Sequence, residues 1–266
     1  MGRVTSKDGT SIAYDRAGSG APVILVGGGL VDPATGRAGR WENAPLATEL
    51  ATWFTVYNYD RRGRADSGDT LPYAVERELE DLEALIAEAG GSAHLYGVSS
   101  GGALALEAAA AGLAADRIGV YEVPYFVGEA AAEPWRRYVE QLDAALADGR
   151  RGDAVELFMR VAGASEDDVA GARSSPLWPG LEAIAHTLAY DAAVLGDGHP
   201  PSARLATITQ PTLVATGGGD RFFEQAADAI AAAVPRARRL AFEGQAHVAD
   251  PKAVAPVLER FFTAGQ

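Results

Sequence analysis

The chain has 266 residues, no cysteine, and a formal net charge of −13 from 23 basic and 36 acidic side chains. This length suits one domain with an inserted subdomain, and the lack of cysteine excludes disulfides and thiolate metal sites. The acidic balance argues against nucleic acid or an anionic membrane as a partner. No apolar run reaches the roughly 18 residues of a membrane span. The first 20 residues lack the apolar core of a signal peptide, so we expect a cytoplasmic protein.

The first part of the chain alternates strands with helices. Two short strands, 3–7 and 11–16, flank the hairpin signal Asp8-Gly9. The apolar run 23–26 predicts a strand buried on both faces. The elements predicted next are a helix at 41–52, a strand at 54–59, a helix at 75–89, a strand at 93–98, a helix at 103–111 and a strand at 118–123. This alternation predicts an α/β fold, with a mostly parallel twisted sheet and helices on both faces.

The alternation stops after residue 127. Helices alone are predicted beyond it, at 134–147, 153–161, 166–173 and 181–194. The sheet then resumes with strands at 212–216 and 238–242, each followed by a helix, at 222–233 and 253–262. We therefore predict a core domain formed by residues 1–127 and 205–266, and a helical cap subdomain, residues 128–204, inserted over the C-terminal edge of the sheet.

A Gly-x-Ser-x-Gly turn, Gly97 to Gly101, joins the strand at 93–98 to an Ala/Leu-rich helix. Strand, sharp turn and helix are the context in which this pattern presents a nucleophilic serine. The turn holds Ser99 in strained backbone geometry, while its glycines let strand and helix approach closely. The N–H of Ser100 lies at a helix N-terminus, where it can stabilise an oxyanion. The alternative is a Gly/Ser loop that only precedes a core helix.

Two further side chains follow strands at the same edge of the predicted sheet. Asp220 comes after the strand at 212–216, and His247 comes after the strand at 238–242. A serine hydroxyl needs a base to take its proton, and a carboxylate fixes the tautomer of that base. We therefore predict Ser99, Asp220 and His247 as the catalytic residues. Glu122, at the end of the strand at 118–123, is the alternative acid, and we prefer Asp220.

The other three histidines are predicted to be structural or exposed. His94 lies inside a strand, His186 inside a helix of the cap, and His199 in a Gly/Pro loop. No two histidines have the spacing of a metal-binding pair. We therefore predict neither a metal site nor a cofactor.

The segment 60–68, D-R-R-G-R-A-D-S-G, interleaves arginine with aspartate. Three arginines could form an anion site, but the interleaved aspartates favour a structural loop held by internal Asp–Arg pairs. The residues concerned are Arg61, Arg62 and Arg64, with Asp60, Asp66 and Asp69.

The sequence resembles the α/β-hydrolase superfamily over nearly its whole length. The matching motifs are G-V-S-S-G at 97–101, D-R-R-G-R-A-D-S at 60–67, G-G-G-D at 217–220 and G-Q-A-H at 244–247. The resemblance implies Ser99 as nucleophile, His247 as base and Asp220 as acid, although some members place the acid where Glu122 lies. It also implies an oxyanion hole formed by the N–H groups of Ser100 and Gly29.

The chain departs from the family pattern at residues 27–28, where many members have His-Gly and this chain has Gly-Gly. Serine at the turn argues against epoxide hydrolases and haloalkane dehalogenases, which use a carboxylate nucleophile in the same fold.

These observations favour a serine hydrolase that cleaves a small-molecule ester, lactone or related acyl compound through an acyl-enzyme on Ser99. One alternative is a C–C hydrolase, lyase or cyclisation enzyme of secondary metabolism with the same triad. Another is a non-catalytic ligand-binding protein. The aromatic residues expected to line the substrate site, or else to be plain core, are Tyr125, Phe126, Phe158, Trp178 and Phe222.

Overall fold

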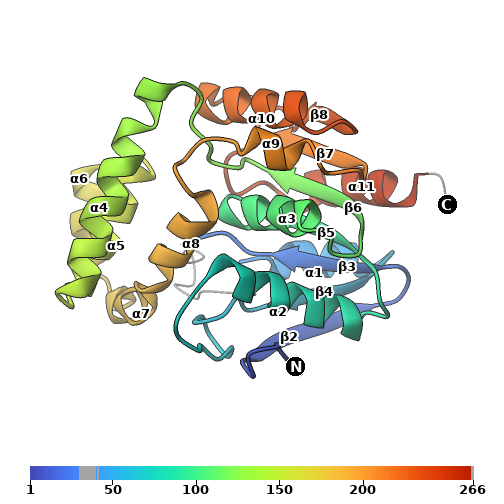
Figure 1. Cartoon of the computed structure of the whole chain (residues 1–266), viewed down its shortest axis with the longest axis horizontal. Coiled ribbons are helices and arrows are strands. Elements are labelled where there is room, and N and C mark those ends of the chain that lie inside the picture. Colours follow the sequence, from blue (N-terminus) through green and yellow to red (C-terminus); the bar gives the residue numbers. More distant parts are fainter. Residues whose placement is uncertain (30–39, 41, 265–266) are drawn as a thin grey trace.

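An eight-stranded sheet forms the centre of the molecule in the computed structural model, which describes residues 1–29, 40 and 42–264 (Figure 1). The strands are β1 Gly2–Thr5, β2 Ser11–Gly18, β3 Pro22–Val26, β4 Thr55–Tyr59, β5 Ala93–Val98, β6 Ala115–Tyr121, β7 Thr212–Thr216 and β8 Ala237–Ala241. Their order in space is β1-β2-β4-β3-β5-β6-β7-β8. The pairs β1–β2 and β2–β4 are antiparallel, and the six strands from β4 to β8 in this order are mutually parallel. The predicted fold class is confirmed.

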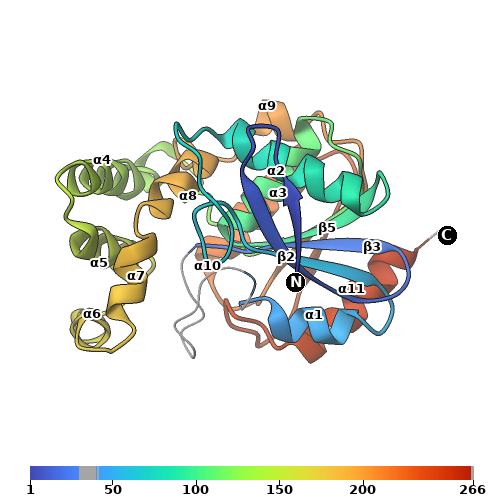
Figure 2. The same ribbon diagram turned by 90° about the horizontal axis from the view of Figure 1, so that it is seen from below.

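Helices cover both faces of the sheet, and this explains the unbroken apolar strands. In β3, Val23 and Leu25 point into one core, and Ile24 and Val26 point into the other. Figure 2 shows α1 and α11 on one side of the sheet and α2 and α3 on the other. The bounds of the flanking helices are α1 Ala44–Leu50, α2 Val75–Glu88, α3 Ser100–Ala110, α10 Arg221–Ala233 and α11 Pro251–Thr263.

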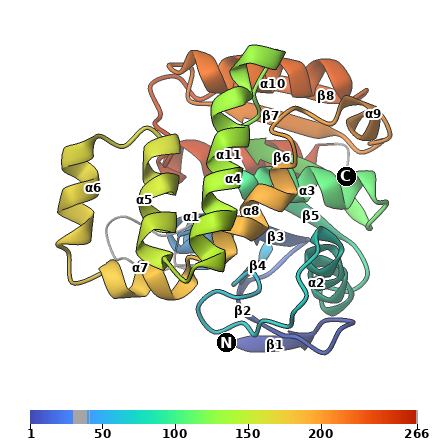
Figure 3. The same ribbon diagram turned by 60° about the vertical axis from the view of Figure 1, so that its left-hand side comes forward.

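The chain between β6 and β7 forms only helices within the described residues, as the sequence predicts. They are η2 Glu129–Ala131, α4 Glu133–Ala147, α5 Arg151–Val161, α6 Glu166–Arg173, α7 Trp178–Ile184, α8 Thr187–Leu195 and α9 Ser202–Leu205. The single helix predicted at 181–194 is two helices, α7 and α8. Helices α4 to α7 lie together at one side of the molecule, and α8 connects them to the core helix α3 (Figures 1 and 3). We call α4 to α8 the insertion helices. None of the described helices has both the length and the apolar character that a bilayer span needs.

The arginine-rich loop after β4 differs from the expectation of internal Asp–Arg pairs. Arg62 is fully buried and donates to Asp81 of α2 at 2.7 and 2.8 Å and to Asp8 at 2.8 Å. Asp60 instead accepts from the side chain and backbone of Arg40. The loop is closed by its own backbone, with Arg64 N–H donating to the Arg61 carbonyl, so its arginine side chains diverge toward other elements. The prediction of internal pairs is therefore wrong.

Candidate active site

The sharp turn after β5 has the geometry expected of a nucleophile elbow. Ser99 has φ 55° and ψ −129°, a strained conformation for a residue other than glycine. A Cβ added to Gly97 would lie 2.3 Å from the Gly101 carbonyl oxygen, and one added to Gly101 would lie 2.3 Å from that of Val26. Both glycines are therefore required by close backbone approach, and the turn is held rigidly between β3, β5 and α3.

The two residues expected to form the oxyanion hole come from two segments next to Ser99, the start of α3 and the glycine loop after β3. Ser100 is the first residue of α3, where backbone N–H groups have no acceptor within the helix. Gly29 follows β3, in a glycine loop that passes directly over the elbow. A Cβ added to Gly28 would lie 3.1 Å from Ser99 Cβ. The glycine loop and the start of α3 therefore both lie next to Ser99.

His247 is paired with Glu122, not with Asp220. The Nδ1 atom of His247 lies 2.7 Å from Glu122 Oε2, and the Gly217 N–H donates to Glu122 Oε1 at 2.8 Å. Glu122 follows β6 directly and is 4% exposed, whereas the His247 side chain is 43% exposed. Ser99 N–H donates to the carbonyl of Tyr121, the residue before Glu122. The Ser99 turn and Glu122 therefore lie at the ends of neighbouring strands, although no hydrogen bond joins the Ser99 hydroxyl to His247 within the described chain.

Asp220 has a structural place at the start of α10. It is exposed, and its Oδ1 accepts from the N–H of Phe222 at 2.8 Å, which is an N-cap contact. The preference for Asp220 as the partner of His247 is therefore corrected in favour of Glu122. The physical reason lies at Gly217, where a Cβ would lie 2.0 Å from the Gln245 carbonyl oxygen. Gly217 lets the histidine loop pack against the end of β7, where the Glu122 carboxylate bridges the two.

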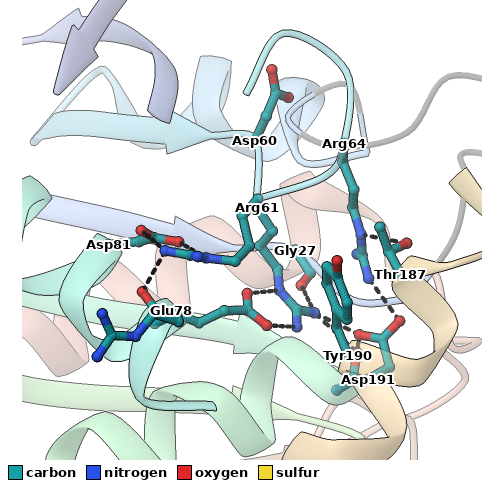
Figure 4. A network of polar contacts seen from close by, with 12 residues as sticks. Gly27, Asp60, Arg61, Arg64, Glu78, Asp81, Thr187, Tyr190 and Asp191 are labelled. Atoms are coloured by element: carbon teal, nitrogen blue, oxygen red, sulfur yellow. Dashed lines mark hydrogen bonds and ion pairs between the residues drawn. The ribbon is translucent and has the colours of Figure 1, made fainter. Parts of the chain in front are cut away.

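A buried ionic network lies beside the elbow and includes an insertion helix (Figure 4). Asp191 of α8 accepts from Arg61 Nη1 at Oδ1 and from Arg64 Nη2 at Oδ2, both at 2.7 Å. Arg61 also donates twice to Glu78 at 2.6 Å. Burial disfavours ionisation of Asp191, but Arg64 and Arg61 outweigh it and hold the pKa of Asp191 below its usual range. Two cations and two carboxylates therefore balance each other in this cluster.

Residues 23–257 match the model of the alpha/beta hydrolase family. The chain belongs to this family. It is 51% identical to an alpha/beta hydrolase of known structure from Sphaerobacter thermophilus DSM 20745, with a TM-score of 0.88 over 98% of this chain and 100% of that one. An enol-lactonase from Burkholderia xenovorans LB400 is 21% identical with a TM-score of 0.69, over 98% of this chain and 100% of that one, which shows a shared fold. The match to the uncharacterized hydrolase YraK of Bacillus subtilis (strain 168), 35% identical over 103 residues, spans 37% of this chain and 35% of that protein.

The aromatic residues that the sequence predicts for the substrate site of this alpha/beta hydrolase fall into three groups. Phe158 faces the glycine loop, since a Cβ on Gly29 would lie 3.5 Å from its ring. Phe126 and Phe222 contact each other, with ring centroids 5.0 Å apart. Tyr125 and Trp178 are 1% and 6% exposed and belong to the hydrophobic core.

Phe223, which the sequence analysis did not single out, stacks on the His247 ring with centroids 4.9 Å apart and planes at 12°. It also contacts Phe222 at 5.1 Å. The sequence signal that could have identified Phe223 is its position next to Phe222, shortly after β7. The end of β7 packs against the loop that carries His247. The ring fixes one face of the imidazole, so Phe223 adds to the orientation that Glu122 provides.

Glu42 of this hydrolase is a further carboxyl group beside the elbow. A Cβ added to Gly28 would lie 3.6 Å from Glu42 Oε1 and 3.1 Å from Ser99 Cβ. Burial raises the pKa of the Glu42 carboxyl to about 7, although Arg64 and His247 attract its charged form. The charge next to the serine therefore changes near neutral pH.

The remaining histidines have structural contacts. The His94 ring stacks on Phe262 in the core, with centroids 4.7 Å apart. His186 contacts Asp69 at 3.2 Å, and His199 Nδ1 lies 3.0 Å from the Phe126 carbonyl oxygen. Across residues 1–29, 40 and 42–264, no three His, Asp or Glu side chains are grouped to hold a metal ion.

Proposed function

We propose that this alpha/beta hydrolase is a serine hydrolase that cleaves a small-molecule ester, lactone or related acyl compound. Ser99 is the nucleophile, His247 the general base and Glu122 the acid of the triad. The observation that carries the proposal is the 2.7 Å contact between Glu122 and His247. Glu122 directly follows β6, which pairs with β5, the strand that leads into the Ser99 elbow. The family match gives the hydrolase class, and this pair supports the serine mechanism.

The contacts of Glu122 determine which nitrogen of His247 carries the proton. Glu122 Oε2 accepts from Nδ1–H, so the lone pair of Nε2 is free to take the proton of Ser99. Gly217 N–H donates to the other carboxylate oxygen and so holds the orientation of Glu122. As the imidazolium forms, the buried carboxylate stabilises its positive charge.

The reaction follows from this arrangement. Ser99 Oγ attacks the carbonyl carbon while His247 accepts its proton, and the N–H groups of Ser100 and Gly29 stabilise the negative oxygen. His247 then gives the proton to the leaving group, and an acyl-enzyme remains. Water attacks the acyl-enzyme with His247 again as base, which frees Ser99. Insertion helices α4 to α8 would act as the cap, with Phe158 against the acyl chain.

Ser99→Ala tests the proposal directly. In subtilisin, loss of the nucleophile costs about a million-fold in kcat. Hydrolysis of p-nitrophenyl esters should therefore fall to background, and a fluorophosphonate probe should no longer label the protein. His247→Ala should lose a similar factor, because nucleophile and base act as a unit. Ser92→Ala, outside the site, serves as the control and should keep full activity. If Ser99→Ala retains more than a few per cent of the wild-type rate, Ser99 is not the nucleophile.

A further inference from the structure

The direction of the Gly29 N–H is fixed from behind the glycine loop. The Gly28 carbonyl and the Gly29 N–H belong to one trans peptide group and therefore point in opposite directions. Arg64 Nη1 donates to the Gly28 carbonyl oxygen, and Arg61 Nη1 lies 3.4 Å from that of Gly27. With its carbonyl held by Arg64, this peptide directs the Gly29 N–H away from the Arg64 guanidinium.

Arg64 is itself held by the insertion helix α8. It is 2% exposed, and its Nη2 donates to Asp191 Oδ2 at 2.7 Å, while its Nε lies 3.3 Å from Thr187 Oγ1. Asp191 also approaches the loop directly, since a Cβ added to Gly29 would lie 3.1 Å from Asp191 Oδ2. The position of the Gly28–Gly29 peptide therefore depends on one carboxylate of α8.

The same carboxylate also reaches the second proposed donor. Ser100 Oγ donates to Asp191 Oδ1 at 2.8 Å, and Ser100 is buried at the first position of α3. One oxygen of Asp191 thus fixes the residue that supplies the N–H on the α3 side. The other fixes, through Arg64, the peptide that supplies the N–H on the β3 side. Asp191 belongs to neither segment and lies 91 residues from Ser100 in the chain.

We propose that Asp191 is a positioning residue that aligns both N–H donors of the oxyanion hole and makes their alignment depend on the insertion helices. The inference rests on the proposed function, because it assumes that these N–H groups receive the developing charge on a substrate bound to Ser99. A donor works only when it lies within hydrogen-bond distance of the oxygen in the transition state, and losing one costs about 10²- to 10³-fold in kcat. Asp191 touches no reacting atom and acts through Arg64 and Ser100.

The test is Asp191→Asn, which keeps the shape of the side chain but turns one arginine-facing oxygen into an amide donor. We expect kcat for a p-nitrophenyl ester to fall by about 10²-fold, with a change in KM of less than about threefold, since ground-state contacts are unchanged. The matched control is Asp81→Asn. Asp81 is fully buried and accepts twice from Arg62, but this pair does not contact the glycine loop. Both variants are compared at a temperature where circular dichroism shows them folded.

A trifluoromethyl ketone provides a readout that a merely structural role would not change. Its adduct with Ser99 places a negative oxygen in the oxyanion hole, so its inhibition constant reports the alignment of the donors. For Asp191→Asn this constant should rise by the same factor by which kcat/KM falls, and for Asp81→Asn it should stay near the wild-type value. Equal activity and equal inhibition in the two variants would overturn the inference, as would a loss in Asp191→Asn confined to KM.

If Asp191→Asn does not fold, Ser100→Ala replaces it, because this change removes only the hydroxyl that donates to Asp191 and leaves the backbone N–H. The 2.8 Å hydrogen bond to Asp191 and the weaker one from Arg61 Nη1 at 3.4 Å are then lost, so we expect a loss of about tenfold in kcat at constant KM. An unchanged kcat in Ser100→Ala would then overturn the inference. Failure of the proposed function is recognised separately, because the wild-type enzyme would then fail to react with the fluorophosphonate, whatever the variants do.

Discussion

Replacing the acid that contacts His247 separates Glu122 from Asp220 with isosteric variants. In Glu122→Gln the Gly217 N–H still needs an acceptor, so the amide oxygen turns toward Gly217 and the amide NH₂ toward His247 Nδ1. An NH₂ group facing Nδ1 forces that nitrogen to accept, which moves the ring proton to Nε2. A histidine protonated at Nε2 cannot take the proton of Ser99.

The expected loss follows from this tautomer. The corresponding Asp-to-Asn change in trypsin lowers kcat about 10⁴-fold, which is about 5 kcal/mol at about 1.36 kcal/mol per decade. We expect the same order for Glu122→Gln, because Glu122 is 4% exposed and water cannot take its place. Asp220→Asn should change kcat by less than about threefold, since asparagine caps a helix as well as aspartate and the site is exposed.

The assay is steady-state hydrolysis of a p-nitrophenyl ester by the wild type and both variants, with fluorophosphonate titration to count reactive Ser99. Folding is checked by thermal unfolding, because Glu122→Gln alters a buried pair. A Glu122→Gln enzyme that keeps a tenth of the wild-type kcat would refute the tautomer argument. A severe Asp220→Asn variant beside a mild Glu122→Gln variant would restore Asp220 as the acid.

Two further predictions concern pH. Burial lowers the pKa of His94 to about 4 from an ordinary value of 6.5. Between about pH 6.5 and about pH 4, His94 is therefore mostly protonated in the unfolded chain and mostly neutral in the folded protein. Between pH 8 and pH 5, the unfolding free energy of the wild type should therefore fall by about 2 kcal/mol more than that of His94→Phe. Urea titration at the two pH values measures both changes. Equal losses in the two proteins would contradict the prediction. Burial raises the pKa of Glu42 to about 7, so its carboxyl is charged at pH 8 and mostly neutral at pH 6. We therefore compare kcat/KM for the anionic p-nitrophenyl hemisuccinate with kcat/KM for the neutral valerate, because pH effects common to both substrates cancel in their ratio. This ratio should be lower at pH 8 than at pH 6 in the wild type, since a charged Glu42 repels the anionic substrate, and equal at the two pH values in Glu42→Gln. A wild-type ratio that does not change with pH would contradict the role of Glu42.

The sequence predicts those features that depend on neighbouring residues. The elbow at Ser99 could be predicted because strand, glycine turn and apolar helix are contiguous. The parallel sheet followed from the alternation of strands and helices, and the interruption after residue 127 revealed the insertion. The position of His247 followed from the same rule, since ligands bind where parallel strands end.

The partners of these residues could not be predicted, because tertiary packing decides them. Glu122 and Asp220 both follow parallel strands, and the choice between them depends on how the loop of His247 packs against Gly217. The arginines after β4 stand among aspartates in the sequence, yet Arg61 pairs with Asp191, which is 130 residues away. Charge patterns in a sequence show that ions will be paired, but a buried loop can direct long side chains to any element that packs against it.

The pairing of His247 with Glu122 has a consequence for the loop after β7. The Gly217 N–H donates to the Glu122 carboxylate. In contrast, a Cβ on Gly219 would meet no described atom within 4 Å, and Asp220 accepts from the N–H of Phe222 in its own helix. The loop is therefore a suitable place to graft a recognition segment, close to the aromatic side chain of Phe222 and outside the proposed triad. An enzyme of this fold that draws its catalytic acid from this loop does not have that freedom, because each insertion would displace the acid.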